Sequence, residues 1–140
     1  MKVDVDATRV TALLDRTVKA LPQEIDRALA ITASQGINLI EDRTAEGRGY
    51  RGGFIPYSES YAKFRQSKGR QTNPVNLSFT NRMLGSMARR RIGRGVEEIY
   101  FTRATESRKA FYNNRLRPFF GFNQTEKRQL SQVFRKALMK

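Results

Sequence analysis

The acidic side chains are the first residues to examine for catalysis, because this chain contains neither histidine nor cysteine. Those two residue types supply the commonest general base, the commonest metal ligand and the thiolate nucleophile. Acidic neighbours occur at Glu41-Asp42 and at Glu97-Glu98. Side chains adjacent in sequence point apart on a helix or a strand, so neither pair has the spacing of a catalytic dyad. We expect no enzymatic activity, no metal site and no cofactor.

Motifs that bind phosphate or activate a serine give the same indication. The sequence has no Walker loop, no HExxH and no GxSxG. Gly47, Gly49 and Gly52 match the spacing of a dinucleotide-binding loop, but the pattern predicts no strand before them. We interpret this match as accidental.

The basic residues are the strongest compositional signal in the chain. The formal net charge is +14, with six Lys/Arg and eight Asp/Glu in residues 1–46 and twenty-one and five in residues 47–140. The first part therefore carries −2 and the remainder +16. A basic surface of this size favours a polyanion or an acidic protein as partner.

Two basic clusters are candidate interaction sites. The segment from Arg48 to Gly53 resembles the Arg/Gly segments that bind single-stranded nucleic acid, and it also fits a flexible loop with solubilising charges. The cluster of residues 89–91 could contact phosphates, or it could complement a helix end and meet an acidic protein surface. We take the following as candidate protein-interaction residues: Arg48, Tyr50, Arg51, Phe54, Tyr57, Tyr61, Arg89, Arg90 and Arg91.

The first 45 residues are expected to be mainly helical. Val3 and Val5 could form a short opening strand, and an apolar stripe with helical spacing begins near Ala7. Pro22 interrupts this stripe, which predicts either two helices that meet near Leu21 or one kinked helix. The second piece should end near residues 43–45, before the glycines that follow.

Residues 46–74 are expected to form an extended basic arm. Glycine and proline punctuate this segment, and a loop of such length is usually functional. Residues 58–66 could form a short helix, with Tyr61, Ala62 and Phe64 as its apolar side.

Residues 75–88 are predicted to form a strand, a cap and a helix in succession. Leu77 and Phe79 alternate with polar residues, as in a half-buried strand, and Thr80 is placed to cap a following helix. Apolar side chains at positions 83, 84, 87 and 88 fall on one helical stripe, so the arginines at 89–91 would lie near the C-terminal end of that helix.

The remaining pattern predicts one strand and two helices. Residues 96–102 read as a strand after a turn at Gly93 and Gly95, and residues 105–114 read as a helix with Ala110 and Phe111 facing inward. Residues 117–122 should be extended, and their three phenylalanines fit the core better than a base-stacking platform. A final amphipathic helix should follow a cap at Asn123.

Together these patterns predict a single α+β domain over residues 1–140. Its parts would be a long N-terminal helix or kinked helix pair (1–45), a long basic loop (46–74), and a mixed part (75–140) with a small antiparallel sheet and a C-terminal amphipathic helix. No apolar run approaches the roughly 18 residues of a membrane span, so we expect no membrane partner and a location on the cytosolic side.

Three segments resemble motifs of a known family. Residues 54–63 (FIPYSESYAK), residues 75–86 (VNLSFTNRMLGS) and residues 117–122 (RPFFGF) are similar to segments of the head–tail joining, neck or tail-completion proteins of tailed bacteriophages, also called virion-morphogenesis proteins. The chain departs from the family pattern at Asn81, where glycine is usual, and at residues 109–114, which replace a histidine-containing stretch.

The resemblance implies a structural virion protein that assembles into a homo-oligomeric ring at the head–tail junction. Such a ring would contact the tail terminator or tail tube on one side and head connector proteins on the other, with DNA in its lumen. It would occupy the host cytoplasm during assembly and the virion afterwards. The alternative from the residues alone is a basic nucleic-acid-binding module that uses the Arg/Gly-rich loop.

Overall fold

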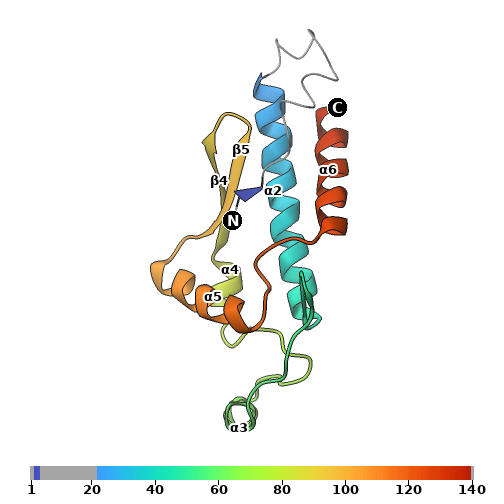
Figure 1. Cartoon of the computed structure of the whole chain (residues 1–140). Coiled ribbons are helices and arrows are strands. Elements are labelled where there is room, and N and C mark those ends of the chain that lie inside the picture. The colour runs from blue at the N-terminus through green and yellow to red at the C-terminus, as the bar shows by residue number, and fades with distance from the viewer. Residues whose placement is uncertain (1, 4–21, 140) are drawn as a thin grey trace. The chain divides into compact units, whose positions relative to one another are not determined.

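The computed structural model describes residues 2–3 and 22–139 (Figure 1). Within this part the chain is α+β, as predicted, with one three-stranded sheet, one two-stranded sheet and five helices. It forms two compact units. Unit 1 includes residues 22–37, 88–100 and 124–139, and unit 2 comprises residues 38–87 and 101–123. The single-domain organisation remains a prediction.

Unit 1 contains most of helix α2 (Pro22–Ala45) and all of helix α6 (Gln124–Leu138). Pro22 starts α2, where its fixed φ suits the first helical turn and its missing N–H costs nothing. The two helices lie side by side over a cluster of buried apolar residues, Ala28, Leu29, Phe134 and Ala137 (Figure 1). The amphipathic stripe predicted for the C-terminal helix is therefore confirmed.

The sheet of unit 1 has the strand order β1-β5-β4. Strand β1 (Lys2–Val3) pairs antiparallel with β5 (Val96–Phe101), in a register that places Val3 opposite Glu97. Strand β4 (Met87–Gly93) is an edge strand joined to β5 by a two-residue turn at Arg94-Gly95. Gly93 thus ends the strand and Gly95, with φ of 73°, makes the turn.

Unit 2 contains the small hairpin β2 (Arg48–Gly49) and β3 (Gly52–Gly53), and helices α3 (Glu59–Ser67), α4 (Arg82–Gly85) and α5 (Ala104–Leu116). Residues 117–123, where the sequence predicts an extended segment, contain neither helix nor strand and bend at several positions. Phe119 is fully buried there, and its ring lies 6.5 Å from that of Phe101. The amide oxygen of Asn114 accepts hydrogen bonds from the N–H groups of Phe119 and Phe120, which fixes the turn after α5.

The prediction of a strand at residues 76–79 was wrong. The N–H of Leu77 donates to the Tyr57 hydroxyl at 3.1 Å, and that of Ser78 donates to the Asn76 side chain at 3.0 Å. Side chains therefore satisfy backbone groups that a strand would have paired in a ladder. Leu77 has φ of 56°, which no strand residue adopts.

The helix predicted after this segment was also wrong in its cap and its length. Asn81, not Thr80, precedes α4; it has φ of 62° and makes no side-chain capping bond. Helix α4 is a single turn, and Met87 and Ala88 belong to β4. The apolar positions 83, 84 and 87 are nevertheless buried, because a one-turn helix followed by a strand buries the same side chains as the longer helix would.

Further corrections concern the predicted positions of single residues. Phe111, predicted to face inward from α5, is 63% exposed, whereas Ala110 is buried. In α3, Tyr61 and Phe64 are exposed and the buried side chain is Arg65. The predicted helix over residues 7–21 and the strand residue Val5 lie outside the described residues.

Candidate protein-interaction site

A buried arginine of α3 organises the site in unit 2. The Arg65 side chain is 1% exposed and donates from Nε to the carbonyl oxygen of Gln71 at 2.7 Å. Its Nη2 donates to the carbonyl oxygen of Ser78 at 2.8 Å and to Oδ1 of Asn76 at 3.3 Å. These bonds tie the loop at residues 71–78 to α3, which is why the loop keeps its path without a β-ladder.

A second arginine joins this site from the segment after α5. Arg117 is 8% exposed and donates from Nε to the Ile55 carbonyl oxygen at 2.9 Å and from Nη2 to that of Pro56 at 2.8 Å. Because Arg117 precedes a proline, its backbone is extended, and the side chain crosses to the segment before α3.

The ring of Tyr57 contacts both cations. The guanidinium carbon of Arg65 lies 4.7 Å from the ring centroid and that of Arg117 lies 4.9 Å from it. An aromatic ring within about 6 Å of a cation attracts it through its quadrupole. Tyr57 thus stabilises two like charges that are both withdrawn from water.

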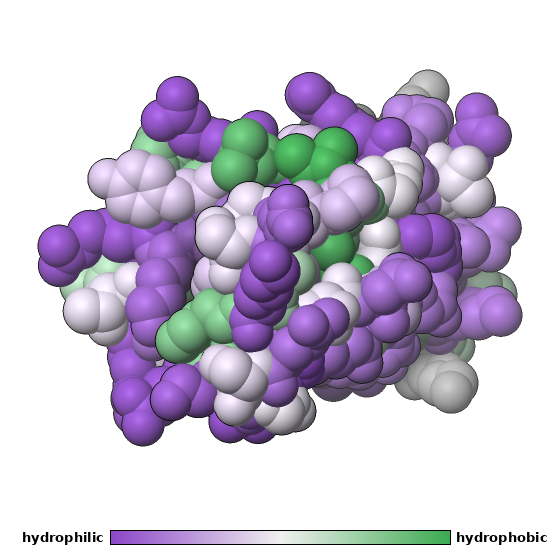
Figure 2. Space-filling model, turned by 90° about the horizontal axis from the view of Figure 1, so that it is seen from below, coloured by the Kyte–Doolittle hydropathy of each residue, from purple (hydrophilic) through white to green (hydrophobic). Residues whose placement is uncertain are grey.

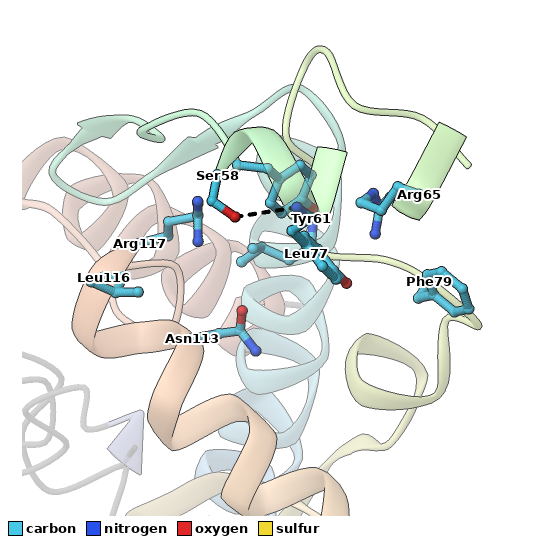
Figure 3. A pocket seen from close by; sticks show the side chains of 9 residues that line it. Ser58, Tyr61, Arg65, Leu77, Phe79, Asn113, Leu116 and Arg117 are labelled. Atoms are coloured by element: carbon cyan, nitrogen blue, oxygen red, sulfur yellow. Dashed lines mark hydrogen bonds between the residues drawn. The ribbon is translucent and has the colours of Figure 1, made fainter. Parts of the chain in front are cut away.

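These residues line a pocket of about 280 Å³ (Figure 3). In Figure 3 Arg117 and Ser58 lie on one side of the opening, Asn113 of α5 lies across from them, and Leu77 lies between. The full lining is Tyr57, Ser58, Tyr61, Arg65, Leu77, Phe79, Asn113, Leu116 and Arg117. The pocket therefore combines two buried cations with aromatic and aliphatic walls.

The start of α3 positions the tyrosines of the pocket. Ser58 caps the helix as its side-chain oxygen accepts from the N–H of Tyr61 at 3.3 Å, in agreement with the predicted short helix. The rings of Tyr57 and Tyr61 meet edge to face, with centroids 5.1 Å apart. From Tyr61 a stack of rings continues through Phe64 to Phe79.

Several apolar side chains of unit 2 are exposed near this pocket. Tyr61 and Leu116, which line the pocket, are 40% and 64% exposed. Phe64, whose ring stacks on that of Tyr61, is also exposed. Figure 2 shows the molecule from the α3 end of Figure 1, where apolar residues in green lie among hydrophilic ones. An apolar rim around a charged pocket is typical of a protein-binding surface.

The structure brings some of the candidate interaction residues to this site and places others elsewhere. Tyr57 and Tyr61 line the pocket. Arg48, Tyr50 and Arg51 lie in the β2–β3 hairpin of unit 2, where the N–H of Tyr50 donates to the Pro118 carbonyl oxygen at 3.1 Å. Arg48 forms an ion pair with Glu46.

Phe54 follows the hairpin and is half-buried, with its N–H bonded to the Gly47 carbonyl oxygen at 2.8 Å. The flexible Arg/Gly loop considered from the sequence is thus a folded turn. Its glycines serve packing, because a Cβ at Gly49 would fall 1.8 Å from the Pro118 carbonyl oxygen.

The arginines at 89–91 belong to unit 1 and lie on β4, so their expected position at a helix end was wrong. Each one pairs with an acid. The closest nitrogen–oxygen distances are 3.4 Å from Arg89 to Glu97, 2.7 Å from Arg90 to Glu98 and 3.2 Å from Arg91 to Asp26.

The Arg90 guanidinium also lies 4.1 Å from the centroid of the Tyr100 ring. The acids Glu97 and Glu98 therefore pair with different arginines and form no dyad. Cross-strand pairs of this kind explain why an arginine-rich segment forms a strand.

The sequence interpretation missed Arg65, Arg117 and Asn113. Arg65 follows Tyr61 by four residues, the spacing at which helical side chains meet, and this was the available signal for it. Arg117 belongs to the third resembling segment, but no sequence pattern indicates that its side chain bonds the carbonyl groups of Ile55 and Pro56.

Glu41, one of the acids considered for catalysis, has a raised pKa. Partial burial disfavours its charged form, and the neighbouring carboxylate of Asp42 adds to the effect. The residue lies on α2 within unit 2.

Over residues 22–139 and the short β1, no three potential ligand side chains gather closely enough to hold a metal ion. None of the helices in the same part of the chain has the length and apolarity needed to cross a membrane. Comparisons with family models, curated proteins and solved structures found no significant match to the chain.

Proposed function

We propose that this protein is a structural subunit of the bacteriophage head–tail junction, a neck or tail-completion adaptor that works by assembly and not by catalysis. The proposal begins from the sequence resemblance of residues 54–63, 75–86 and 117–122. It would place copies of the chain in a ring that joins the head connector to the tail terminator around the DNA channel.

The observation that supports it most is that the three resembling segments meet at one point of unit 2. Arg117 of the third segment bonds the carbonyl groups of Ile55 and Pro56 in the first. Tyr57 of the first accepts the N–H of Leu77 in the second. Three motifs that are far apart in the sequence thus behave as one structural element, as expected if they share one origin.

The departure at Asn81 is physically consistent with the resemblance. The family pattern has glycine at this position, and Asn81 has φ of 62° in this chain. Glycine adopts the left-handed region freely, and asparagine is among the residues that tolerate it best. The substitution therefore preserves the backbone that the pattern requires.

The exposed surface of unit 2 also supports assembly. A closed ring needs two different patches on each subunit, because every copy contacts one neighbour with each. The pocket with its rim of Tyr61 and Leu116 offers one such patch.

A nonsense mutation in the encoding gene tests the proposal. Electron microscopy of lysates from the mutant should show filled heads and completed tails that are not joined, and wild-type protein supplied in trans should restore joined particles. Mass spectrometry should detect the chain in wild-type virions. Normal, infectious mutant particles would contradict the proposal.

A further inference from the structure

The two buried arginines lack a counter-charge among the described residues. The acceptors of Arg65 and Arg117 are backbone carbonyls and the Asn76 amide, all of them neutral, and no carboxylate pairs with either side chain within residues 22–139. A buried charge is costly unless an opposite charge or strong hydrogen bonds offset it. Both cations line one pocket, so an anion bound there would offset the free-energy cost of burying them.

Each guanidinium also retains donors. Nε and Nη2 make the hydrogen bonds described above, whereas Nη1 of Arg65 and Nη1 of Arg117 have no acceptor in the part of the chain that the structure describes. The planar fork of arginine matches the two oxygens of a carboxylate or the oxygens of a phosphate. The pocket is therefore prepared for an anionic group.

The size and rim of the pocket favour a carboxylate side chain over a nucleic acid. A volume of about 280 Å³ lies just below the roughly 300–1,000 Å³ of ligand pockets and suits one side chain. The rim residues Tyr61 and Leu116 are apolar and exposed, and would contact apolar residues beside the acid. Only two of the residues that line the pocket are cations, whereas a nucleic-acid backbone is usually bound along a longer series of them.

We propose that this pocket binds an aspartate or glutamate side chain of another protein molecule, within a segment whose neighbouring residues are apolar. Arg65 and Arg117 attract the carboxylate by their charge, Tyr57 orients the two cations, and Tyr61 and Leu116 contact the flanking side chains. The inference rests on the proposed function in that it names the partner chemistry of the adaptor, but the binding itself is measured without particles.

Fluorescence anisotropy of two labelled heptapeptides tests the proposal. One peptide has a central Leu-Glu-Phe and the other a central Leu-Gln-Phe, with Gly and Ser on both sides. The glutamate peptide should bind on the order of tenfold more tightly, because a charge-assisted hydrogen bond contributes about 1.5 kcal/mol or more. Equal affinities would overturn the proposal.

Substitutions at the rim locate the binding without removing either buried arginine. Leu116→Glu places a carboxylate at the mouth of the pocket, and Leu116→Gln is its neutral match in size. Leu116→Glu should bind the glutamate peptide about tenfold more weakly than Leu116→Gln does, because the introduced carboxylate competes for the cations. Equal binding by the two variants would show that the peptide binds elsewhere.

Thermal unfolding of the same two variants tests the pocket without a peptide. Leu116→Glu should melt at a higher temperature than Leu116→Gln at pH 7, because the tethered carboxylate supplies the missing counter-charge. This difference should shrink as pH falls below the pKa of an ordinary glutamate, about 4.3, and vanish once the side chain is protonated in the folded state as well. A lower melting temperature for Leu116→Glu at pH 7 would contradict the proposed pocket.

A competition assay separates protein from nucleic-acid ligands. Unlabelled glutamate peptide should displace the labelled one from the wild-type protein, and single-stranded oligonucleotide or inorganic phosphate at the same concentration should not. Displacement by the oligonucleotide in the wild type but not in Leu116→Glu would assign the pocket to nucleic acid and overturn the proposal. If particle assembly fails to depend on the protein while the peptide results hold, only the proposed function is lost.

Discussion

Arg65 is a buried charged residue that bonds the loop at residues 71–78 to helix α3. Its guanidinium replaces the backbone pairing that residues 71–78 lack, and it does so from a position that is 1% exposed. Most buried arginines pair with an acid, whereas this one is held by carbonyl oxygens and aromatic rings. Its loss would leave the carbonyl oxygens of Gln71 and Ser78 without a donor, and Asn76 Oδ1 would keep only the N–H of Ser78.

Arg65→Met is expected to lower the free energy of unfolding by about 3 kcal/mol, because buried acceptors lose charged donors and the methionine side chain makes no hydrogen bond. Urea denaturation followed by circular dichroism measures the loss. The control is Arg70→Met at an exposed position, which should cost less than about 1 kcal/mol. A loss for Arg65→Met no larger than for the control would contradict the role assigned to Arg65.

Glu41 provides a prediction on pH dependence. Its folded-state pKa is raised by burial and by Asp42, so the folded protein binds this proton more tightly than the unfolded chain. Stability from this group is therefore present at low pH and is lost as pH rises through the unfolded and then the folded pKa.

Glu41→Gln should raise the melting temperature slightly at pH 7 and have no such effect near pH 3, where the wild-type side chain is protonated. Asp42→Asn provides the control for removal of the neighbouring charge. A variant that is less stable than wild type at pH 7 would show that ionised Glu41 makes a favourable contact.

At the scale of elements, the sequence predictions were correct where the interactions that form a helix or strand lie within a few residues of it. The helices α2, α3 and α6 and the strand β5 were predicted because Pro22, Ser58 and the apolar stripes act within a few residues. The segment at 75–88 was not, because the contacts that decide it come from Tyr57 and Arg65, ten to twenty residues earlier. The pocket also includes Arg117, whose hydrogen-bond acceptors are the carbonyl groups of Ile55 and Pro56. A local sequence pattern does not predict a contact over so long a separation.

Helix α3 depends on its N-cap. Ser58→Ala should destabilise the protein by about 1 kcal/mol, because the N–H of Tyr61 loses its acceptor. Amide hydrogen exchange at the first turn of α3 should accelerate accordingly. Ser60→Ala, inside the same helix and exposed, is the matched control and should be neutral or slightly stabilising. Similar losses in both variants would argue against a capping role.

The hairpin β2–β3 depends on close backbone approach at one of its glycines. Gly49→Ala would place a methyl group 1.8 Å from the Pro118 carbonyl oxygen, so the backbone must move, at a cost of about 3 kcal/mol. Gly53→Ala is the control, because a Cβ there meets nothing within 4 Å. Thermal unfolding compares the two, and equal melting temperatures would contradict this packing.

At the scale of the whole molecule, several of the 27 Lys/Arg side chains form ion pairs with acidic side chains, and the net charge of +14 is what remains. The arginines of β4 have acidic partners, and so does Arg48 of the hairpin. The guanidinium groups of these pairs are exposed, whereas Glu97 is buried, and each pair engages a cation that would otherwise be available to a polyanion. The remaining basic residues are scattered over helices, loops and strands.

Binding to single-stranded DNA should therefore be weak and strongly salt-dependent. Contacts to several phosphates lose about a thousandfold in affinity between 50 and 200 mM salt, and we expect at least this slope here. Filter binding across that range measures it, with Leu116→Gln as a variant that should not change the slope. Tight binding that persists at 200 mM salt would favour the nucleic-acid-binding alternative.

Leu77 shows what the described arrangement means for the second resembling segment. A bulky residue with φ of 56° is unfavourable by itself, and here the Tyr57 hydroxyl and burial hold it in place. The conformation of this loop therefore depends on contacts with surrounding residues and not on its own amino-acid sequence alone. Cut out as a peptide or grafted onto another scaffold, residues 75–81 would relax to a different conformer. Likeness in this stretch therefore has meaning only together with Tyr57 and Arg65, which bond it.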